Sequence, residues 1–230
     1  MNTITIPDDG AQIFIFNQDN PPIDLQQLAT SLSADEHDRM AMFVTHRLRL
    51  RYLARRGMLR YLVGQWMGID ASDIHFSYGD FGKLHLSDDY HINVSHSKQW
   101  VMVGLCHSAI GVDIEAMIAS DDLADITRTH FAPEEQIAWS ALPKNHRVQG
   151  FYNAWTRKEA FIKMDGRGLQ IPLDSFAVTL APNDNPRIIC SDCVDARAWQ
   201  LWDLPVPSGF AGALVTGTQV RTVTLILWQS

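Results

Sequence analysis

The sequence contains little cysteine, no long apolar run and no excess of positive charge. Three cysteines in 230 residues do not make a disulfide framework. No window of about 18 apolar residues is present, so a membrane span is not expected. Residues 1–10 carry no basic start followed by an apolar stretch, so we expect no signal peptide and a cytoplasmic location. The formal net charge of −7 argues against a nucleic-acid binder with a broad basic surface.

What remains is a globular chain. With 46% hydrophobic residues it can bury a sizeable core, as one domain or as two packed halves. Cys190 and Cys193 form a lone Cys-x-x-Cys without two further zinc ligands at suitable spacing, so we interpret them as incidental thiols and leave any role open.

The pattern of apolar residues and turn residues predicts an α+β protein with antiparallel sheets and helices packed against them. A capping-box pattern starts a helix at Ser33, and Pro133 marks another helix start. Two long helices are expected at about 45–67 and 145–164, with Gly166 closing the second. The expected strands are 13–16, 74–78, 84–86, 91–95, 100–106, 110–115, 175–180, 187–190, 198–204, 209–215 and 220–227.

One predicted strand carries two acids on the same face. Side chains alternate along a strand, so Val112 and Ile114 face a core while Asp113 and Glu115 share the opposite face, about 6–7 Å apart. Such a pair is usually a solvated face. A nearby third carboxylate would instead suit Mg²⁺, which prefers oxygen ligands.

The helix expected from 145 to 164 supplies that third carboxylate. Glu159 and Lys163 are one turn apart on one side of it. The ordinary interpretation is a surface salt bridge worth a few tenths of a kcal/mol. Trp155, Phe161 and Ile162 make this helix amphipathic, however, which places the pair beside apolar surface.

The positive charge of the chain is strongly local. Within fourteen residues the long N-terminal helix carries six arginines, which are Arg47, Arg49, Arg51, Arg55, Arg56 and Arg60. They suit either a solvated, salt-bridged face or phosphate capture, because guanidinium groups match phosphate oxygens.

A third segment combines small polar residues with an imidazole. Residues 93–97 read Asn-Val-Ser-His-Ser, and we interpret them as a turn at a strand end that can hold an anion. A purely structural role for His96 is the alternative.

The chain resembles the Sfp-type 4′-phosphopantetheinyl transferases in these segments, which in sequence order are the arginine helix, residues 93–97, Gly111–Glu115 and Trp155–Lys163. The resemblance implies a pseudo-two-fold pair of similar α+β halves, residues 1–112 and 113–230, with the active site in the cleft between them. It implies a monomeric enzyme that moves 4′-phosphopantetheine from coenzyme A to a serine of an apo acyl or peptidyl carrier protein, with release of adenosine 3′,5′-bisphosphate. Neither nucleic acid nor a membrane takes part.

The resemblance also implies roles for individual residues. Asp113, Glu115 and Glu159 would hold Mg²⁺ against the pyrophosphate of coenzyme A. Glu159, Lys163 and His96 would be catalytic, and either Glu159 or a metal-bound water would take the serine proton. The expected coenzyme A contacts are Arg47, Arg56, Lys83, Ser95, His96, Lys158 and Lys163.

Two alternatives remain beside this interpretation. One is a non-catalytic module that binds coenzyme A or a carrier protein. The other is a metal-dependent nuclease, which would place Glu159 and Lys163 on a strand. The identity of the carrier, and whether it serves fatty acid, polyketide, peptide or siderophore synthesis, stays open.

Overall fold

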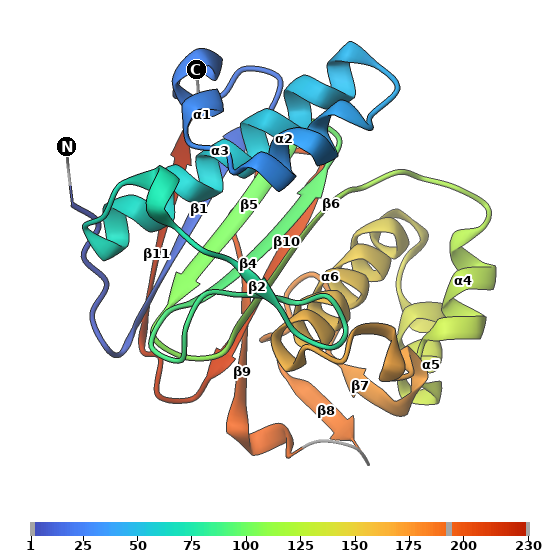
Figure 1. The fold of residues 1–230 in the computed structure, drawn as a ribbon. Helices are drawn as coiled ribbons and strands as arrows, with labels where there is room; N and C mark the ends of the chain where they lie inside the picture. The colour runs from blue at the N-terminus through green and yellow to red at the C-terminus, as the bar shows by residue number, and fades with distance from the viewer. Residues whose placement is uncertain (1–2, 192–194, 229–230) are drawn as a thin grey trace.

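The computed structural model describes residues 3–191 and 195–228, and within them two β-sheets each carry one long helix (Figure 1). The first sheet has the strand order β11-β1-β5-β4, with bounds Thr222–Trp228, Gly10–Asn17, Trp100–Cys106 and His91–Ser97. The second sheet has the order β6-β10-β9, with bounds Ile110–Ala116, Phe210–Gly217 and Trp199–Asp203. Two small hairpins pair β2 with β3 and β7 with β8, with bounds Ser77–Tyr78, Leu84–His85, Phe176–Val178 and Ile188–Ser191. The helices are α1 Leu25–Thr30, α2 Ala34–Ala41, α3 His46–Met67, α4 Leu123–His130, α5 Pro133–Ala141 and α6 Arg147–Asp165.

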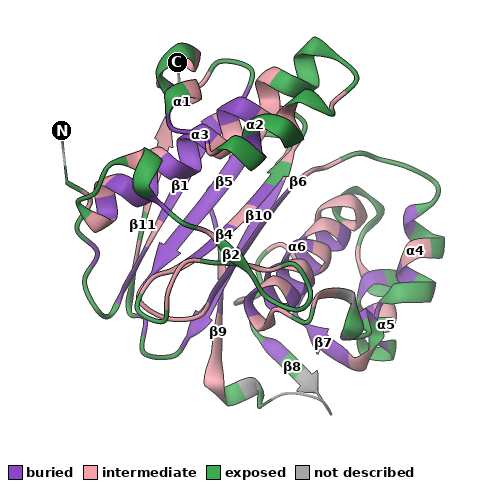
Figure 2. Ribbon diagram, viewed as in Figure 1, coloured by how far each residue is buried: buried purple, intermediate pink, exposed green. Residues whose placement is uncertain are grey.

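Helix α3 covers one face of the first sheet. It starts where the Thr45 side chain accepts the Leu48 backbone N–H, and it ends at Gly68, whose φ of 69° suits a residue without a Cβ. Its buried side chains pack on even-numbered residues of β1, including Phe14 and Phe16. Figure 2 shows buried positions repeated along α3 where it faces the sheet.

The other face of the first sheet packs on the second sheet. Ile13 and Ile15 of β1 belong to the same buried cluster as Val112 and Ile114 of β6. Because strand residues alternate between faces, β1 contributes to two cores. The result is a layered arrangement of α3, first sheet, second sheet and α6.

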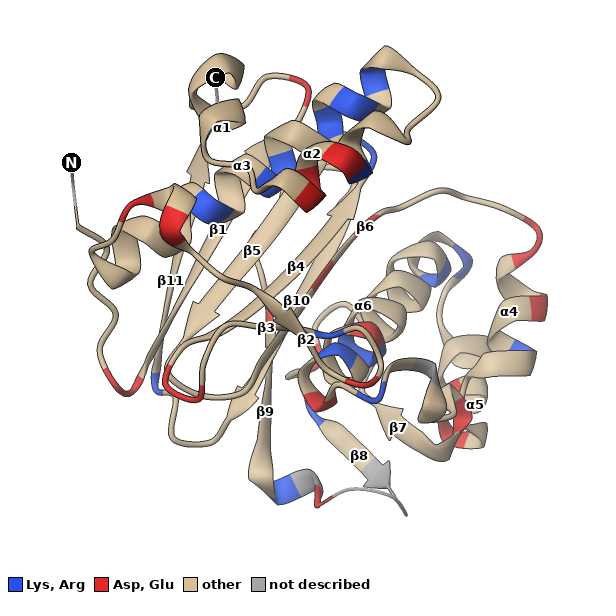
Figure 3. Cartoon of the chain, in the orientation of Figure 1, with Lys and Arg blue, Asp and Glu red and all other residues tan. Residues whose placement is uncertain are grey.

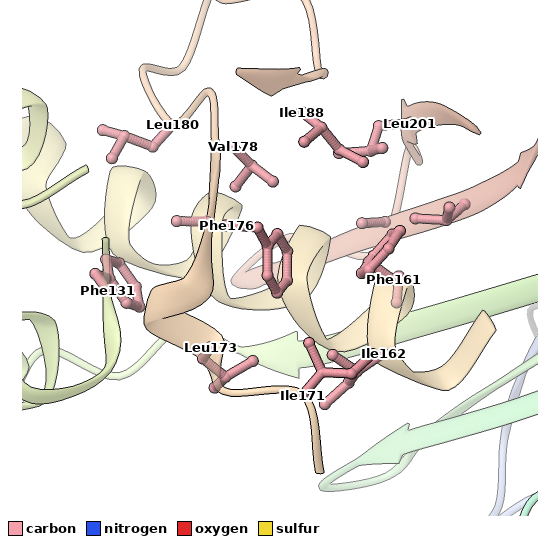
Figure 4. Close-up of a cluster of buried hydrophobic side chains, with 14 of the residues drawn as sticks. Phe131, Phe161, Ile162, Ile171, Leu173, Phe176, Val178, Leu180, Ile188 and Leu201 are labelled. Atoms are coloured by element: carbon pink, nitrogen blue, oxygen red, sulfur yellow. The ribbon is translucent and has the colours of Figure 1, made fainter. Parts of the chain in front are cut away.

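Helix α6 covers the outer face of the second sheet. Its buried side chains, among them Phe161 and Ile162, pack with Phe176 of β7 and Leu201 of β9 (Figure 4). Gly166, with a φ of 93°, ends the helix as expected from the sequence.

The two halves are joined by the last strand. After the second sheet is complete, β11 returns to the first sheet and pairs in parallel with β1, from Gly10 opposite Thr222 to Phe16 opposite Trp228. The boundary expected between residues 112 and 113 falls inside β6, all of which belongs to the second sheet.

Most predicted elements are confirmed as α+β structure, although the strand expected at 175–180 is shortened to Phe176–Val178. The strand expected at 74–78 is limited to Ser77–Tyr78; residues 71–73 form a 3₁₀ turn capped by the Asp70 side chain, and the Ile74 carbonyl oxygen accepts a hydrogen bond from the Arg60 side chain. Helix α1 is an element that the sequence did not indicate. Cys193 lies outside the described residues, so the interpretation of the Cys-x-x-Cys is not tested. Within residues 3–191 and 195–228, none of the helices has the length and apolar character that crossing a bilayer requires.

Candidate functional site

The candidate site lies where the edge strands β4 and β6 of the two sheets run side by side, a line that we call the seam. Side chains join these strands. Three polar side chains of β4 accept alternate backbone N–H groups of β6: Asn93 accepts from Val112 at 2.9 Å, Ser95 from Ile114 at 3.4 Å and Ser97 from Ala116 at 3.1 Å. Each bond advances two residues along both strands, so β4 and β6 are parallel.

This arrangement corrects the expectation of an anion-holding turn at residues 93–97. The segment is a strand, and the reversal comes afterwards at Lys98, whose φ is 52°. The physical reason is the two-residue alternation of the segment. Ile92 and Val94 pack toward the α3 core, while the polar side chains between them face the seam.

The same serines also bind the two acids of β6. Ser95 Oγ donates to Asp113 Oδ1 at 2.7 Å, and Ser97 Oγ donates to Glu115 Oε2 at 2.7 Å. The prediction that both acids share one face, opposite the Val112 side chain, is confirmed. Asp113 is 1% exposed, so its carboxylate is inside the protein and not on a solvated face.

Helix α6 approaches β6 closely because of Gly111. A Cβ at this position would lie 2.0 Å from the carbonyl oxygen of Ala160 and 2.5 Å from the backbone nitrogen of Met164. Only glycine fits such an approach. The contact sets the helix turn that carries Glu159 and Lys163 against the strand that carries the acids.

Lys163 is bound directly to this acidic cluster. Its Nζ lies 2.5 Å from Asp113 Oδ1 and 3.0 Å from Ser95 Oγ. The second oxygen of that carboxylate, Asp113 Oδ2, is buried and has no hydrogen-bond partner. A buried carboxylate oxygen without a donor is costly, and a bound cation is one way to satisfy it.

The other two carboxylates are held in unfavourable electrostatic surroundings. Burial raises the pKa of Glu159, and the charges of Asp113 and Glu115 add to the rise while Lys163 opposes it. Burial also raises the pKa of Glu115, with a further contribution from the charge of Asp113. Three carboxylates therefore act on one another, and the charges of Lys163 and, at Glu115, Lys98 offset them in part.

The carboxylates of this cluster are the type of side chain that binds a divalent cation. Among the described residues, no set of three or more His, Cys, Asp and Glu side chains is arranged to hold a metal ion as the structure stands. The donor chemistry nevertheless fits Mg²⁺, because the cluster offers carboxylate oxygens, one of which is unsatisfied. A cation would also relieve the repulsion that raises the pKa values of Glu115 and Glu159.

His96 is an exposed residue of β4 that is affected by charges on both long helices. Partial burial, followed by the charges of Arg55, Lys163 and Arg51, lowers its pKa to about 4. The imidazole is therefore neutral at pH 7, and it hydrogen-bonds without adding a fixed charge. Its side chain belongs to the face of β4 opposite the seam serines.

The arginines of α3 divide into separate groups, and Figure 3 shows their basic positions repeated along the helix. Arg51 and Arg55, which the sequence did not single out, act electrostatically on His96. Arg51 binds Asp19 through two nitrogens at 2.6 Å each, and the exposed Arg47 reaches the same carboxylate at 3.0 Å.

Arg56, expected to contact coenzyme A, instead binds Glu36 and the Tyr78 hydroxyl. Glu36 is 2% exposed and also holds Arg60 at 2.6 Å, so these two arginines stabilise the packing of α2 on α3. The reason is that Glu36, the capping-box residue of α2, is buried between the helices and needs cationic partners.

Lys158 does not face the site, which corrects its expected role beside the pyrophosphate. Its side chain is fully buried on the opposite side of α6, 2.8 Å from Glu135, and it donates to the carbonyl oxygens of Leu173 and Phe176. Adjacent helix positions point about 100° apart. Glu159 therefore turns toward β6 while its neighbour enters the C-terminal core.

Lys83 lies at the end of α6 and not on the seam. Its Nζ donates to the carbonyl oxygen of Met164, and burial lowers its pKa. It lines a pocket of about 290 Å³ together with Lys163 and with residues of β4 and the loop before β3, among them Asn93 and Phe81. The pocket places Lys83 beside the site residues without a direct bond to them.

Sequence reasoning missed the contacts of Asn93 and Ser97 and the position of Arg51 and Arg55. A signal for the first two was present. The Asn-x-Ser-x-Ser and Asp-x-Glu patterns share a two-residue period, so two adjacent parallel strands place their polar side chains in register.

Comparison with known proteins places these residues in a family context. Residues 109–216 match the model of the 4′-phosphopantetheinyl transferase superfamily. The chain is 29% identical over 221 residues to the 4′-phosphopantetheinyl transferase HetI of Nostoc sp., covering 93% of this chain and 91% of that protein. It is 33% identical over 163 residues to the 4′-phosphopantetheinyl transferase Sfp of Bacillus subtilis, covering 65% of this chain and 72% of that protein.

Among solved structures, the holo-[acyl-carrier-protein] synthase of Thermotoga maritima shows a partial likeness. The identity is 19% and the TM-score is 0.39, over 48% of this chain and 62% of that chain.

Proposed function

This chain belongs to the 4′-phosphopantetheinyl transferase superfamily, and we propose that it moves 4′-phosphopantetheine from coenzyme A to a serine of an apo acyl or peptidyl carrier protein. One observation carries the site assignment. The buried Asp113 has an unsatisfied oxygen in a cluster with Glu115, Glu159 and Lys163.

In this reaction the serine loses a proton and negative charge develops on the phosphate oxygens, and these residues can assist both changes. The serine oxygen forms a bond to the phosphorus that bears pantetheine, and the bond from that phosphorus to adenosine 3′,5′-bisphosphate breaks. The serine proton goes to Glu159, a carboxylate of this cluster. Lys163 stabilises the negative charge that develops on the phosphate oxygens.

We infer that Asp113, Glu115 and Glu159 hold Mg²⁺. When bound, the ion neutralises charge on the pyrophosphate of coenzyme A. The proposal is supported by the unsatisfied Asp113 Oδ2 and by the raised pKa values of the two glutamates. Lys163 keeps one oxygen of the Asp113 carboxylate engaged, which leaves Oδ2 for the metal.

We propose that the phosphates of coenzyme A bind near His96, where the charges of Arg51, Arg55 and Lys163 act. The neutral His96 imidazole is suited to hydrogen-bond a phosphate oxygen. Arg51 is paired with the exposed Asp19 and Arg56 with the buried Glu36, so we propose Arg51 and not Arg56 as a phosphate contact. Lys83 and the adjoining pocket remain a proposed contact for the adenosine side.

The test is a transfer assay with coenzyme A, Mg²⁺ and a panel of apo-carriers, read as a mass gain on one carrier serine. Asp113→Ala and Glu159→Ala should each lower turnover by at least about 100-fold. The exposed Asp125, on α4, provides the matched control Asp125→Ala, which should keep wild-type turnover. Full activity of either site variant would refute the assignment.

The same assay separates the alternatives. Tight binding of coenzyme A without release of adenosine 3′,5′-bisphosphate would indicate a non-catalytic module. The nuclease alternative required Glu159 and Lys163 on a strand, but both residues lie on α6.

A further inference from the structure

Two serines of β4 have a contact pattern that the proposed chemistry does not explain. Ser95 and Ser97 each accept a backbone N–H of β6 and each donate to a carboxylate of β6. Asn93, two residues earlier, accepts the Val112 N–H and so makes the same seam bond without a carboxylate contact. The same side-chain bond to a backbone N–H of β6 therefore occurs without a carboxylate contact at Asn93 and with one at Ser95 and Ser97.

The hydrogen-bond chemistry fixes the direction of the Ser97 contact. A serine hydroxyl has a single proton to donate and lone pairs to accept. The Ala116 backbone N–H occupies a lone pair of Ser97 Oγ at 3.1 Å. The hydroxyl proton then points to Glu115 Oε2, which lies 2.7 Å away.

We propose that Ser97 is a positioning residue that holds the Glu115 carboxylate in the orientation required for metal binding, as Ser95 does for Asp113. This inference rests on the proposed function. Glutamate has one more rotatable bond than aspartate, so an unsupported Glu115 would sample more orientations. Lys163 gives Asp113 a second support, whereas the described contact that holds the Glu115 side chain is the one to Ser97.

The register of the two strands supports this role. In each serine–carboxylate pair the partners are eighteen residues apart in sequence, Ser95 with Asp113 and Ser97 with Glu115. The backbone bonds of Asn93, Ser95 and Ser97 share a spacing of nineteen residues. A slip of the seam would therefore disturb both carboxylates together, and the seam bonds keep the pair in register.

The test measures metal binding directly. Mn²⁺, which takes the same oxygen ligands as Mg²⁺, is titrated into the protein and the free ion is followed by electron paramagnetic resonance. Removing a group that orients a metal ligand typically weakens metal affinity by about 10- to 100-fold. We expect Ser97→Ala to show such a loss, and Ser97→Thr, which keeps a hydroxyl, to stay within about twofold of wild type.

Asn93→Ala is the matched control, because it removes a seam bond but no carboxylate contact. We expect its Mn²⁺ affinity to stay within about twofold of wild type, even where its thermal midpoint falls. Equal losses in Asn93→Ala and Ser97→Ala would show that seam integrity matters and would overturn the positioning role. Wild-type affinity in Ser97→Ala, or no Mn²⁺ binding by the wild type, would also overturn it.

A parallel transfer assay with the wild-type protein separates this inference from the proposed function. A wild type that transfers phosphopantetheine, together with an unchanged Mn²⁺ affinity in Ser97→Ala, refutes only the role of Ser97. A wild type without transfer to any apo-carrier refutes the proposed function, and the Mn²⁺ titration still decides the role of Ser97 in metal binding.

Discussion

Two lysines on α6 have different partners because their side chains point in different directions. Lys158 and Lys163 are five residues apart on α6, which turns them about 140° from each other around the helix. The first is fully buried against Glu135, and the second binds Asp113 at the seam. The sequence identified both as cations near a carboxylate but not their partners, because Glu135 comes from a different helix.

The difference predicts that one substitution lowers transfer activity at one lysine and not at the other. Lys158→Met leaves Glu135 buried without its cation and should cost about 3–5 kcal/mol of the free energy of unfolding. Lys163→Met also leaves a buried carboxylate, Asp113, without its cation and should lower stability too, but it should in addition lower transfer activity strongly, which Lys158→Met should not. Urea unfolding and the transfer assay measure the two effects. Near-wild-type stability of Lys158→Met, or full activity of Lys163→Met, would contradict this division.

The Glu159 carboxylate should lower the thermal stability of the protein while it supports transfer activity. Burial and the Asp113 charge raise its folded-state pKa, so its ionised form opposes folding at any pH above the ordinary glutamate value. Glu159→Gln should therefore raise the thermal midpoint at pH 7.5 while abolishing transfer. The sign follows from linkage: the raised pKa favours the folded state as pH falls, so the advantage of the glutamine variant should shrink toward acid pH.

Differential scanning calorimetry without added metal, over a series of pH values, tests this expectation. The control is Glu134→Gln, at an exposed position on α5, which should change the midpoint little. A lower midpoint for Glu159→Gln at pH 7.5 would show that the carboxylate makes a stabilising contact and is not repelled by Asp113.

At the scale of elements, periodicity identified the strands and helices but not how strands pair. The acids of β6 and the helix bearing Glu159 were predicted where they lie, because alternation and the i, i+4 spacing are local properties. Residues 93–97 were misread as a turn, because their polar residues had no visible partner. That partner is an edge strand from the other sheet, which no local pattern reveals.

Gly111 is the residue of β6 that allows α6 to pack closely against the strand. In Gly111→Ala the added Cβ meets the backbone of Ala160 and Met164, which are not free to move aside as a side-chain tip would be. The helix must shift, at a cost of about 1–3 kcal/mol, and Glu159 and Lys163 move with it. We expect a lower unfolding free energy and a loss of transfer activity.

Gly79→Ala is the comparison for this element. Its added Cβ would have the Lys83 carbonyl oxygen, at 3.8 Å, as its nearest neighbour, an ordinary contact distance. Urea unfolding should show little change for Gly79→Ala and a clear loss for Gly111→Ala. Equal stability of the two variants would show that α6 tolerates a wider separation from the strand.

At the scale of the whole molecule, the two halves share a sheet, because the C-terminal strand β11 pairs with the N-terminal strand β1. A division of the sequence into residues 1–112 and 113–230 does not show this pairing. The two-layer α+β character of each half follows from its elements, which the sequence predicted. The return of β11 to pair with β1 does not follow, because it joins residues more than two hundred positions apart. The alternation of β11 adds Leu225 to the core between the sheets and Ile226 to the core under α3.

This shared structure predicts one cooperative unit. Leu62 of α3 is fully buried in the N-terminal core, and Leu62→Ala should cost about 2–5 kcal/mol. If the cores unfold together, hydrogen exchange measured by mass spectrometry should show the same loss of protection in α6 as in α3. The reason is that β6 and β1 bury side chains in one common cluster between the sheets, so neither sheet keeps its core when the other opens. Wild-type protection of α6 in Leu62→Ala would show that the C-terminal half is stable by itself, and the seam would then be an interface between two independently folding units.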